Sequence, residues 1–291
     1  MSTTSGVRPK SPTERLLAAN SWVVYAFFYA PILVLIVFSF NDNNNVGIWT
    51  EPSFRWYEAM LDDNDVLRAI RTSLIVALIS TVVATILGTM AALALERFRF
   101  RGQRAYDGLV YLPIIIPDVT MAVMLLLFFA QGFRILDGLI GWSPSFGIGT
   151  ISLSHIAFNI SFVAVVVRAR LGQLDPRLEE AAADLYANRW QAFRRVTLPL
   201  ILPGVMGGAL LALTLSLDDV VVTSFVAGPG ATTLPVYVFG LVRRAVTPLI
   251  NAVSTTMLVA SMILVGISLG FQRNTRSTVP VTEPQPEPAN Q

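Results

Sequence analysis

Six long apolar runs constrain the fold of this 291-residue chain more than any other feature. A helix needs about 20 apolar residues to cross the roughly 30 Å of hydrocarbon in a bilayer. The runs cover residues 22–40, 72–95, 108–129, 151–167, about 200–226 and 252–271. Because 54% of the residues are hydrophobic and only 14% are charged, the sequence predicts an all-α integral membrane protein with six transmembrane helices.

Two of the runs are less regular than the rest. The third contains Pro113 and Pro117, so it is predicted to be broken or kinked there, since proline removes a helix hydrogen bond. The fourth is short and is interrupted by the polar residues His155 and Asn159.

Arginines indicate which loops face the cytoplasm, because Lys and Arg near span ends are retained there. Arginines cluster over residues 97–104, after the second run, and over residues 168–195, after the fourth. The loop after the first run is rich in acidic residues, which suits the outer face. Both termini are therefore predicted to be cytoplasmic, although Arg243 and Arg244 in the last outer loop count weakly against this topology.

The expected organisation is a cytoplasmic tail over residues 1–20, a transmembrane domain over 21–272 and a second cytoplasmic tail over 273–291. The last segment alternates proline with polar residues and cannot bury apolar surface, so it is predicted to be disordered. At residues 228–230 the sequence Gly-Pro-Gly predicts a tight turn.

Composition excludes several kinds of chemistry. The chain has no cysteine and a single histidine, so disulfides, thiol nucleophiles and metal clusters are not expected. A net charge of +2 is too small to suggest a nucleic-acid surface. No Ser/His constellation and no G-x-x-x-x-G-K-[ST] phosphate loop occurs, so neither catalysis nor ATP binding is predicted for this chain.

A charged, alanine-rich insertion separates the fourth and fifth runs, over residues 175–199. Asp175 followed by Pro176 predicts the start of a short helix that extends to about Ala187. Asn188, with Gln191 three residues later, predicts the cap of a second short helix. The periodicity fits two alternatives equally: a loop packed on its own spans, or a helix presented to a groove on a partner.

One pattern in this insertion resembles the EAA loop of ABC importer permeases. The family pattern is Glu-Ala-Ala, three residues, Gly, nine residues, Ile, one residue, Leu-Pro. The spacing is kept here by Glu180-Ala181-Ala182, Tyr186, Val196 and Leu198-Pro199. Tyr186 stands where the family has glycine and Val196 where it has isoleucine. The first departure raises the question of how the turn between the two helices is made without glycine.

The resemblance implies a MetI-like permease fold in a bacterial or archaeal inner membrane, with the insertion docked on a cytoplasmic ATPase. ATP and Mg²⁺ would be bound by that partner, and this chain would hold no cofactor or metal. The other implied partners are a second homologous permease, a pair of ATPase subunits and an extracytoplasmic substrate-binding protein. The residues implied to face the ATPase are Glu180, Ala181, Ala182, Leu185 and Tyr186.

Every formal charge inside the runs is negative: Asp118, Asp218 and Asp219. A carboxylate near mid-membrane costs roughly 2.5–3.5 kcal/mol, so such acids tend to line a substrate path, here for a cation. Neighbours on a helix point about 100° apart, so only one of Asp218 and Asp219 can face the path directly, and Asp219 is favoured. Asp118 has an alternative role as the cap of a helix restarting after Pro117. His155 is interpreted as a histidine hydrogen-bonded between spans rather than as a proton relay.

Residues 112–118, 215–229 and 248–252 are similar to the spermidine/putrescine subfamily of these permeases, which implies a polyamine substrate. Another organic cation or an amino acid stays open as cargo, because sister importers share much of this pattern. Trp49, Trp56 and Tyr57 either cover an amine or anchor the chain at the membrane interface. From a different class, an ion-driven secondary transporter should show inverted repeats, and none is visible in the sequence.

Overall fold

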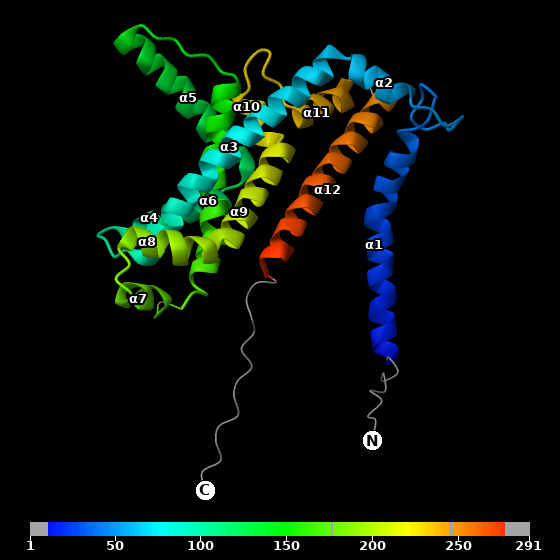
Figure 1. Ribbon diagram of the computed structural model, residues 1–291. Coiled ribbons are helices and arrows are strands. Elements are labelled where there is room, and N and C mark those ends of the chain that lie inside the picture. The colour runs from blue at the N-terminus through cyan, green and yellow to red at the C-terminus, as the bar shows by residue number, and fades with distance from the viewer. Residues whose placement is uncertain (1–10, 176, 245–246, 277–291) are drawn as a thin grey trace, which may run out of the picture. The chain divides into compact units, whose positions relative to one another are not determined.

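The computed structural model describes residues 11–175, 177–244 and 247–276, and these are helical apart from loops and an isolated antiparallel bridge between Asn41 and Pro52 (Figure 1). The predicted all-α class is confirmed. In chain order the helices are α1 (Pro12–Phe38), α2 (Arg55–Asp62), α3 (Asn64–Arg97), α4 (Gln103–Ile115), α5 (Asp118–Ile140), α6 (Ile148–Leu171), α7 (Arg177–Asp184), α8 (Arg189–Ala192), the π-helix η1 (Phe193–Thr197), α9 (Leu198–Asp218), α10 (Val221–Val226), α11 (Leu234–Arg244) and α12 (Pro248–Arg276).

Within these described residues, six helical stretches are long and apolar enough to cross a membrane, as predicted. They are α1, α3, α5, α6, the continuous stretch Arg189–Asp218 and Pro248–Gly266 of α12. Helix α1 begins inside the expected tail, where Ser11 and Glu14 form a capping box. Helix α12 continues to Arg276, and the segment expected to be disordered beyond it lies outside the described residues.

The third span is broken where the prolines predict, but its predicted limits are wrong. Helix α4 ends at Ile115, Ile116 is extended (φ −71°, ψ 132°), and α5 runs from Asp118 to Ile140. The break falls at Pro117 because proline pushes the preceding residue out of the helical region, whereas Pro113 is accommodated within α4. The spanning helix therefore covers 118–140 and includes Arg134, so not every charge in a candidate span is negative.

The fifth run was predicted to continue to residue 226. This limit is wrong for a single helix, because α9 ends at Asp218. Asp219 is extended (φ −65°, ψ 124°) and α10 begins at Val221. The carboxylate of Asp219 accepts hydrogen bonds from the backbone N–H groups of Val222 and Thr223, and such a bond competes with helix continuation. The two aspartates thus do not share one helix, and the argument from a 100° separation does not apply to them.

The chain forms two compact units. Of the described residues, one unit holds those up to Asp63 together with Leu241–Met257, and the other holds Asn64–Gly240 with those from Leu258 onward. The charged insertion and all three intramembrane acids belong to the second unit.

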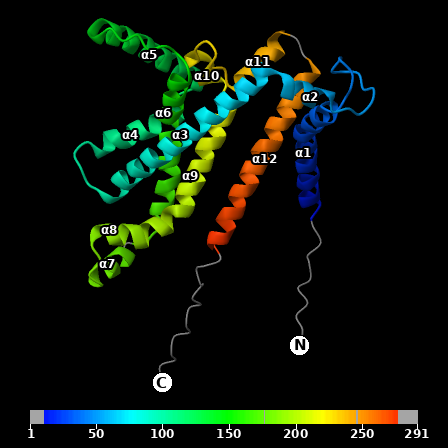
Figure 2. The ribbon, with the colours of Figure 1, turned by 45° about the horizontal axis from the view of Figure 1, so that its top comes forward.

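Helices α3, α6 and α9 pack against one another at the centre of the second unit (Figures 1 and 2). Their backbones approach closely around Val163, where Gly88 of α3 and Gly208 of α9 meet α6. A Cβ atom added to Gly88 would lie 2.7 Å from Cβ of Val163 and 2.8 Å from the carbonyl oxygen of Ile160. Small residues at such crossings are typical of helix packing in membranes, since they allow backbone contact.

The predicted Gly-Pro-Gly turn is confirmed. The N–H of Ala231 donates to the carbonyl oxygen of Gly228 at 3.1 Å, and Gly230 has a φ of 76°, which only glycine adopts without strain. This turn closes the segment that follows α10.

Candidate functional site

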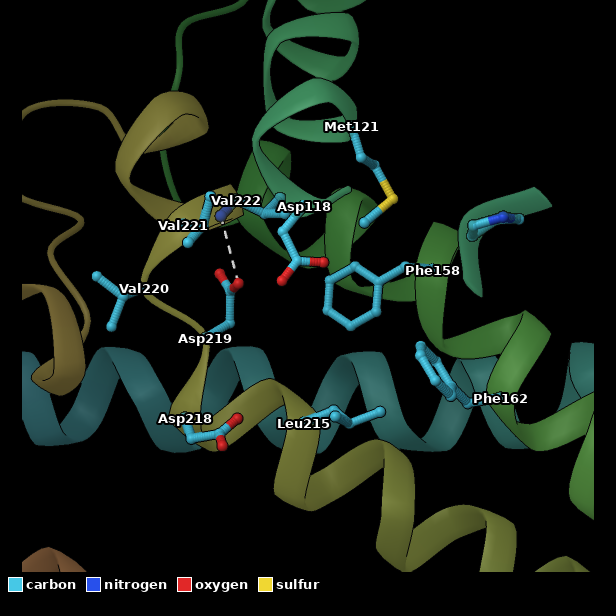
Figure 3. A pocket seen from close by; sticks show the side chains of 11 residues that line it. Asp118, Met121, Phe158, Phe162, Leu215, Asp218, Asp219, Val220, Val221 and Val222 are labelled. Atoms are coloured by element: carbon cyan, nitrogen blue, oxygen red, sulfur yellow. Dashed lines mark hydrogen bonds between the residues drawn. The ribbon is translucent and has the colours of Figure 1, made fainter. Parts of the chain in front are cut away.

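A pocket of about 380 Å³ lies at the junction of the two helix breaks. It is lined by Pro113, Asp118, Met121, Phe158, Phe162, Leu215 and Asp218 to Val222. The structure thus brings together all three acids singled out in the sequence, from segments about 100 positions apart. In Figure 3 the carboxylates of Asp118 and Asp219 point toward one another, with the ring of Phe158 beside Asp118.

Asp219 uses both of its carboxylate oxygens inside the protein. Oδ1 accepts from the N–H of Val222 at 3.3 Å, and Oδ2 accepts from both the N–H and the hydroxyl of Thr223, each at 2.7 Å. Nε2 of His155 lies 3.3 Å from the same Oδ2. Asp219 therefore ends α9, caps α10 and pairs with α6, besides lining the pocket.

His155 is completely buried and extends this polar contact into the helix core. Its Nδ1 lies 2.7 Å from Oγ of Ser216, and its Nε2 lies 3.0 Å from Oγ1 of Thr223. Since the Thr223 hydroxyl donates to Asp219, the Thr223 oxygen can accept from Nε2 of His155. Oγ of Ser216 in turn lies 3.0 Å from Oγ of Ser80. The histidine is thus hydrogen-bonded between spans, the simpler of its two interpretations.

Sequence reasoning missed the partners in this chain, Ser80, Ser216 and Thr223. A signal for two of them was present, because Ser216 precedes Asp219 by three residues and Thr223 follows it by four, both inside an apolar run. No comparable local signal exists for Ser80, which is 136 positions from Ser216.

Asp118 and Asp218 differ from Asp219 in their surroundings. Both are exposed, and neither side chain has a hydrogen bond or ion pair to another residue in the described part of the chain. Asp118 is the first residue of α5, but its side chain makes no capping bond, so the alternative role as a cap is not observed. These two carboxylates are open to a ligand.

Apolar side chains form the rest of the wall. Phe158 and Phe162 lie one turn apart on α6, and Met121 and Leu215 come from α5 and α9. Aromatic faces attract cations and also cover methylene groups, so the wall suits a ligand that is both charged and aliphatic.

The charged insertion forms two short helices, α7 and α8, as predicted, but α7 ends at Asp184 rather than near Ala187, because a turn begins at Leu185. Asn188 and Gln191 make the predicted capping box, with the N–H of Gln191 donating to Oδ1 of Asn188 at 2.8 Å. Of the residues expected to face an ATPase, Glu180, Ala181, Leu185 and Tyr186 are exposed and Ala182 is half-buried.

Tyr186 makes the turn in the conformation that a glycine would adopt. It has a φ of 60°, and the side chain is 98% exposed. Its N–H donates to the carbonyl oxygen of Ala183 at 2.9 Å, and the N–H of Ala187 donates to the carbonyl oxygen of Ala182 at 3.0 Å. These two bonds form the Schellman motif of a helix C-terminus. The turn geometry is retained without glycine, at a cost of about 1–2 kcal/mol.

The aromatic residues of the first outer loop take part in the packing of that loop. Nε1 of Trp56 donates to the carbonyl oxygen of Asn41 at 2.9 Å, and the hydroxyl of Tyr57 lies 2.7 Å from Oγ of Ser39. Trp49 meets Phe38 edge to face. These contacts account for the three rings without a ligand.

The fold and the pocket define the class: a multi-span helical membrane protein with an acid-lined pocket among its helices and an exposed helical insertion between two of its spans. A family model described as "Binding-protein-dependent transport system inner membrane component" matches residues 84–276. The chain belongs to this family, the permease subunits of ABC importers. It is a multi-pass inner membrane protein that works with a substrate-binding protein and an ATPase, and it is the ATPase that binds ATP.

Two relatives narrow the comparison. The chain is 46% identical over 235 residues to the putrescine transport system permease protein PotI of Escherichia coli (strain K12), covering 80% of this chain and 82% of the relative. It is 40% identical over 251 residues to the spermidine/putrescine transport system permease protein PotC of Haemophilus influenzae, covering 86% and 93%.

Two solved structures share the fold. A bacterial ABC transporter that imports the acidic polysaccharide alginate matches with a TM-score of 0.74 at 21% identity, covering 90% of this chain and 96% of that one. The MetNI methionine transporter in an inward-facing conformation matches with a TM-score of 0.61 at 18% identity, covering 72% and 95%. The predicted MetI-like permease fold is confirmed, and an ion-driven secondary transporter is set aside by the family.

Proposed function

We propose that this chain is a permease subunit of an ABC importer for polyamines such as putrescine and spermidine. The observation that carries the proposal is the convergence of Asp118, Asp218 and Asp219 on one pocket with apolar walls. The similarity to PotI and PotC supports the same cargo. The fold does not decide it, because a chain of the same fold serves a transporter of an acidic polysaccharide.

The pocket chemistry fits a linear polyamine. Such a molecule carries ammonium groups separated by methylene segments, so it needs carboxylates for its charges and apolar surface between them. Asp118 and Asp218 offer open carboxylates, and Phe158 and Phe162 offer the apolar surface. A desolvated cation near an aromatic face gains up to about 2 kcal/mol, which helps to offset the loss of water.

The three acids have different roles in binding the substrate. Asp118 and Asp218 contact the ammonium groups directly, since they have no partner in the described part of the chain. Asp219 adds negative charge to the pocket wall, but its carboxylate oxygens already contact Thr223, Val222 and His155. Asp219 remains part of the path, although its first role is to hold α10 in place.

The complete transporter contains a second, homologous permease, two ATPase subunits and an extracytoplasmic substrate-binding protein. Both termini of this chain face the cytoplasm, as does the charged insertion. Glu180, Ala181, Ala182, Leu185 and Tyr186 form the surface that docks on an ATPase. Opening and closing of that ATPase alternately exposes the acid-lined path to the loaded binding protein and to the cytoplasm.

The test is uptake of labelled putrescine by the reconstituted transporter with saturating binding protein. Replacing Asp118 and Asp218 together with asparagine should lower the uptake rate at least about tenfold, because each lost charged hydrogen bond is worth about 1.5–3 kcal/mol. Asp137→Asn is the matched control, an exposed acid at the far end of α5 that does not line the pocket. Wild-type uptake in the double variant would refute the assignment of the path.

A further inference from the structure

Glu179, which directly precedes the EAA residues, faces its own chain rather than a partner. Its Oε1 lies 2.7 Å from Nη2 of Arg97, and the hydroxyl of Thr197 donates to the same Oε1. The side chains of Glu179 and Arg97 are 33% and 27% exposed, so the pair is half-buried, whereas the neighbouring Glu180 is exposed. Consecutive glutamates on α7 thus have opposite surroundings.

This one carboxylate oxygen joins three elements. Arg97 is the last residue of α3, Glu179 lies in the first turn of α7, and Thr197 is the last residue of η1, next to the start of α9. Helices α3 and α9 pack against each other in the core of the unit. A displacement of α7 that Glu179 follows is therefore applied to two spans at once.

The far end of α9 lies at the substrate pocket. Helix α9 has 21 residues, so at 1.5 Å per residue it carries movement over about 30 Å, from Thr197 to Asp218. It connects rigidly to the pocket because Ser216 near its end belongs to the buried chain of His155. The contact at Glu179 and the acid-lined pocket thus lie at the two ends of the same helix.

The segment around Thr197 connects α8 to α9 with an irregular helix geometry. Residues Phe193–Thr197 form a π-helix, a rare geometry that often occurs at functional sites. Thr197 is 2% exposed, so the hydroxyl that donates to Glu179 comes from a buried residue. Nε of Arg97 is buried and has no hydrogen-bond partner among the described residues, and the guanidinium pairs with Glu179 through Nη2.

We infer that Glu179 is the transmission residue of this permease: it passes movement of the docked α7 to α3 and α9, while Glu180 belongs to the docking surface. The inference rests on the proposed docking of the insertion on an ATPase. Loss of Glu179 leaves that surface intact but disconnects it from the spans, so ATP hydrolysis no longer opens the path.

The experiment compares two adjacent, isosteric substitutions, Glu179→Gln and Glu180→Gln, in the complete transporter in proteoliposomes. Glu179→Gln should retain the ATPase on purification and hydrolyse ATP, but putrescine uptake per ATP should fall about tenfold. Glu180→Gln should instead weaken retention of the ATPase. The charge exchange Arg97→Glu with Glu179→Arg should recover at least about a third of wild-type uptake per ATP, since it restores the ion pair in reverse.

Three results would overturn the inference. They are wild-type uptake per ATP in Glu179→Gln, loss of the ATPase from Glu179→Gln to the same extent as from Glu180→Gln, and no recovery in the charge exchange. Failure of the docking proposal itself is a separate result, because it would appear as full ATPase retention after Leu185→Arg, a change at a side chain that is 81% exposed.

Discussion

Asp219 shows how much a single side chain does in this protein. Its carboxylate ends α9, caps α10, accepts from Thr223 and meets His155, and it also lines the pocket. A buried carboxylate is tolerated here because donors from two helices compensate for the water it has lost. The acid favoured from the sequence as the substrate ligand is therefore the most occupied of the three.

Thr223 is predicted to be the most sensitive hydroxyl of this network. Thr223→Val keeps the shape but removes the donor to Asp219 and the partner of His155, so it should destabilise the permease by about 1–3 kcal/mol. Thermal unfolding of the purified protein measures this. The matched control is Thr214→Val on α9, whose exposed side chain bonds only the carbonyl oxygen of Leu210 in its own helix. Equal melting temperatures for the two variants would contradict the role given to Thr223.

At the scale of the element, interrupted helices carry the function. The break at Pro117 exposes Asp118 at the start of α5, and the break at Asp219 exposes Asp218 at the end of α9. Irregular backbone at membrane depth is tolerated where it lines a cavity or is buried in protein. Both breaks therefore place polar groups on the pocket and away from lipid.

The turn between α7 and α8 gives an element-scale prediction that separates backbone from side chain. Tyr186→Gly and Tyr186→Val both remove the ring, but only valine strongly disfavours the left-handed conformation at φ 60°. Tyr186→Gly should keep the Schellman turn, and Tyr186→Val should lose it. Hydrogen exchange at the N–H of Ala187, which bonds Ala182, reports the difference. Similar protection in both variants would show that the turn does not depend on this residue.

At the scale of the whole molecule, the tight crossing of α3, α6 and α9 connects the insertion to the pocket. α7 and η1 lie at the cytoplasmic end of these helices in the proposed topology, and the acids lie at the other end of α9. Small residues such as Gly88 and Gly208 let the three helices pack with their backbones in close contact.

Gly88→Ala tests this crossing. The added methyl group would lie 2.8 Å from the backbone oxygen of Ile160, which cannot move aside, so the change should cost about 1–3 kcal/mol of stability. Gly108→Ala in α4, where a Cβ would meet no atom within 4 Å, should be neutral or slightly stabilising. Differential scanning calorimetry of the two variants measures their thermal stability. A Gly88→Ala protein as stable as the wild type would mean that the crossing is looser than this contact indicates.

The sequence by itself determined the number of spans, the break at Pro117, the cap at Asn188 and the family pattern from Glu180 to Pro199. These features are local, because apolar length, proline and capping residues act within a few positions of the chain. Only the tertiary structure decided that Asp219 is occupied while Asp118 and Asp218 are open, and that Glu179 rather than Glu180 holds Arg97. These distinctions depend on partners that are distant along the chain, such as His155 and Ser216, and local periodicity carries no record of them.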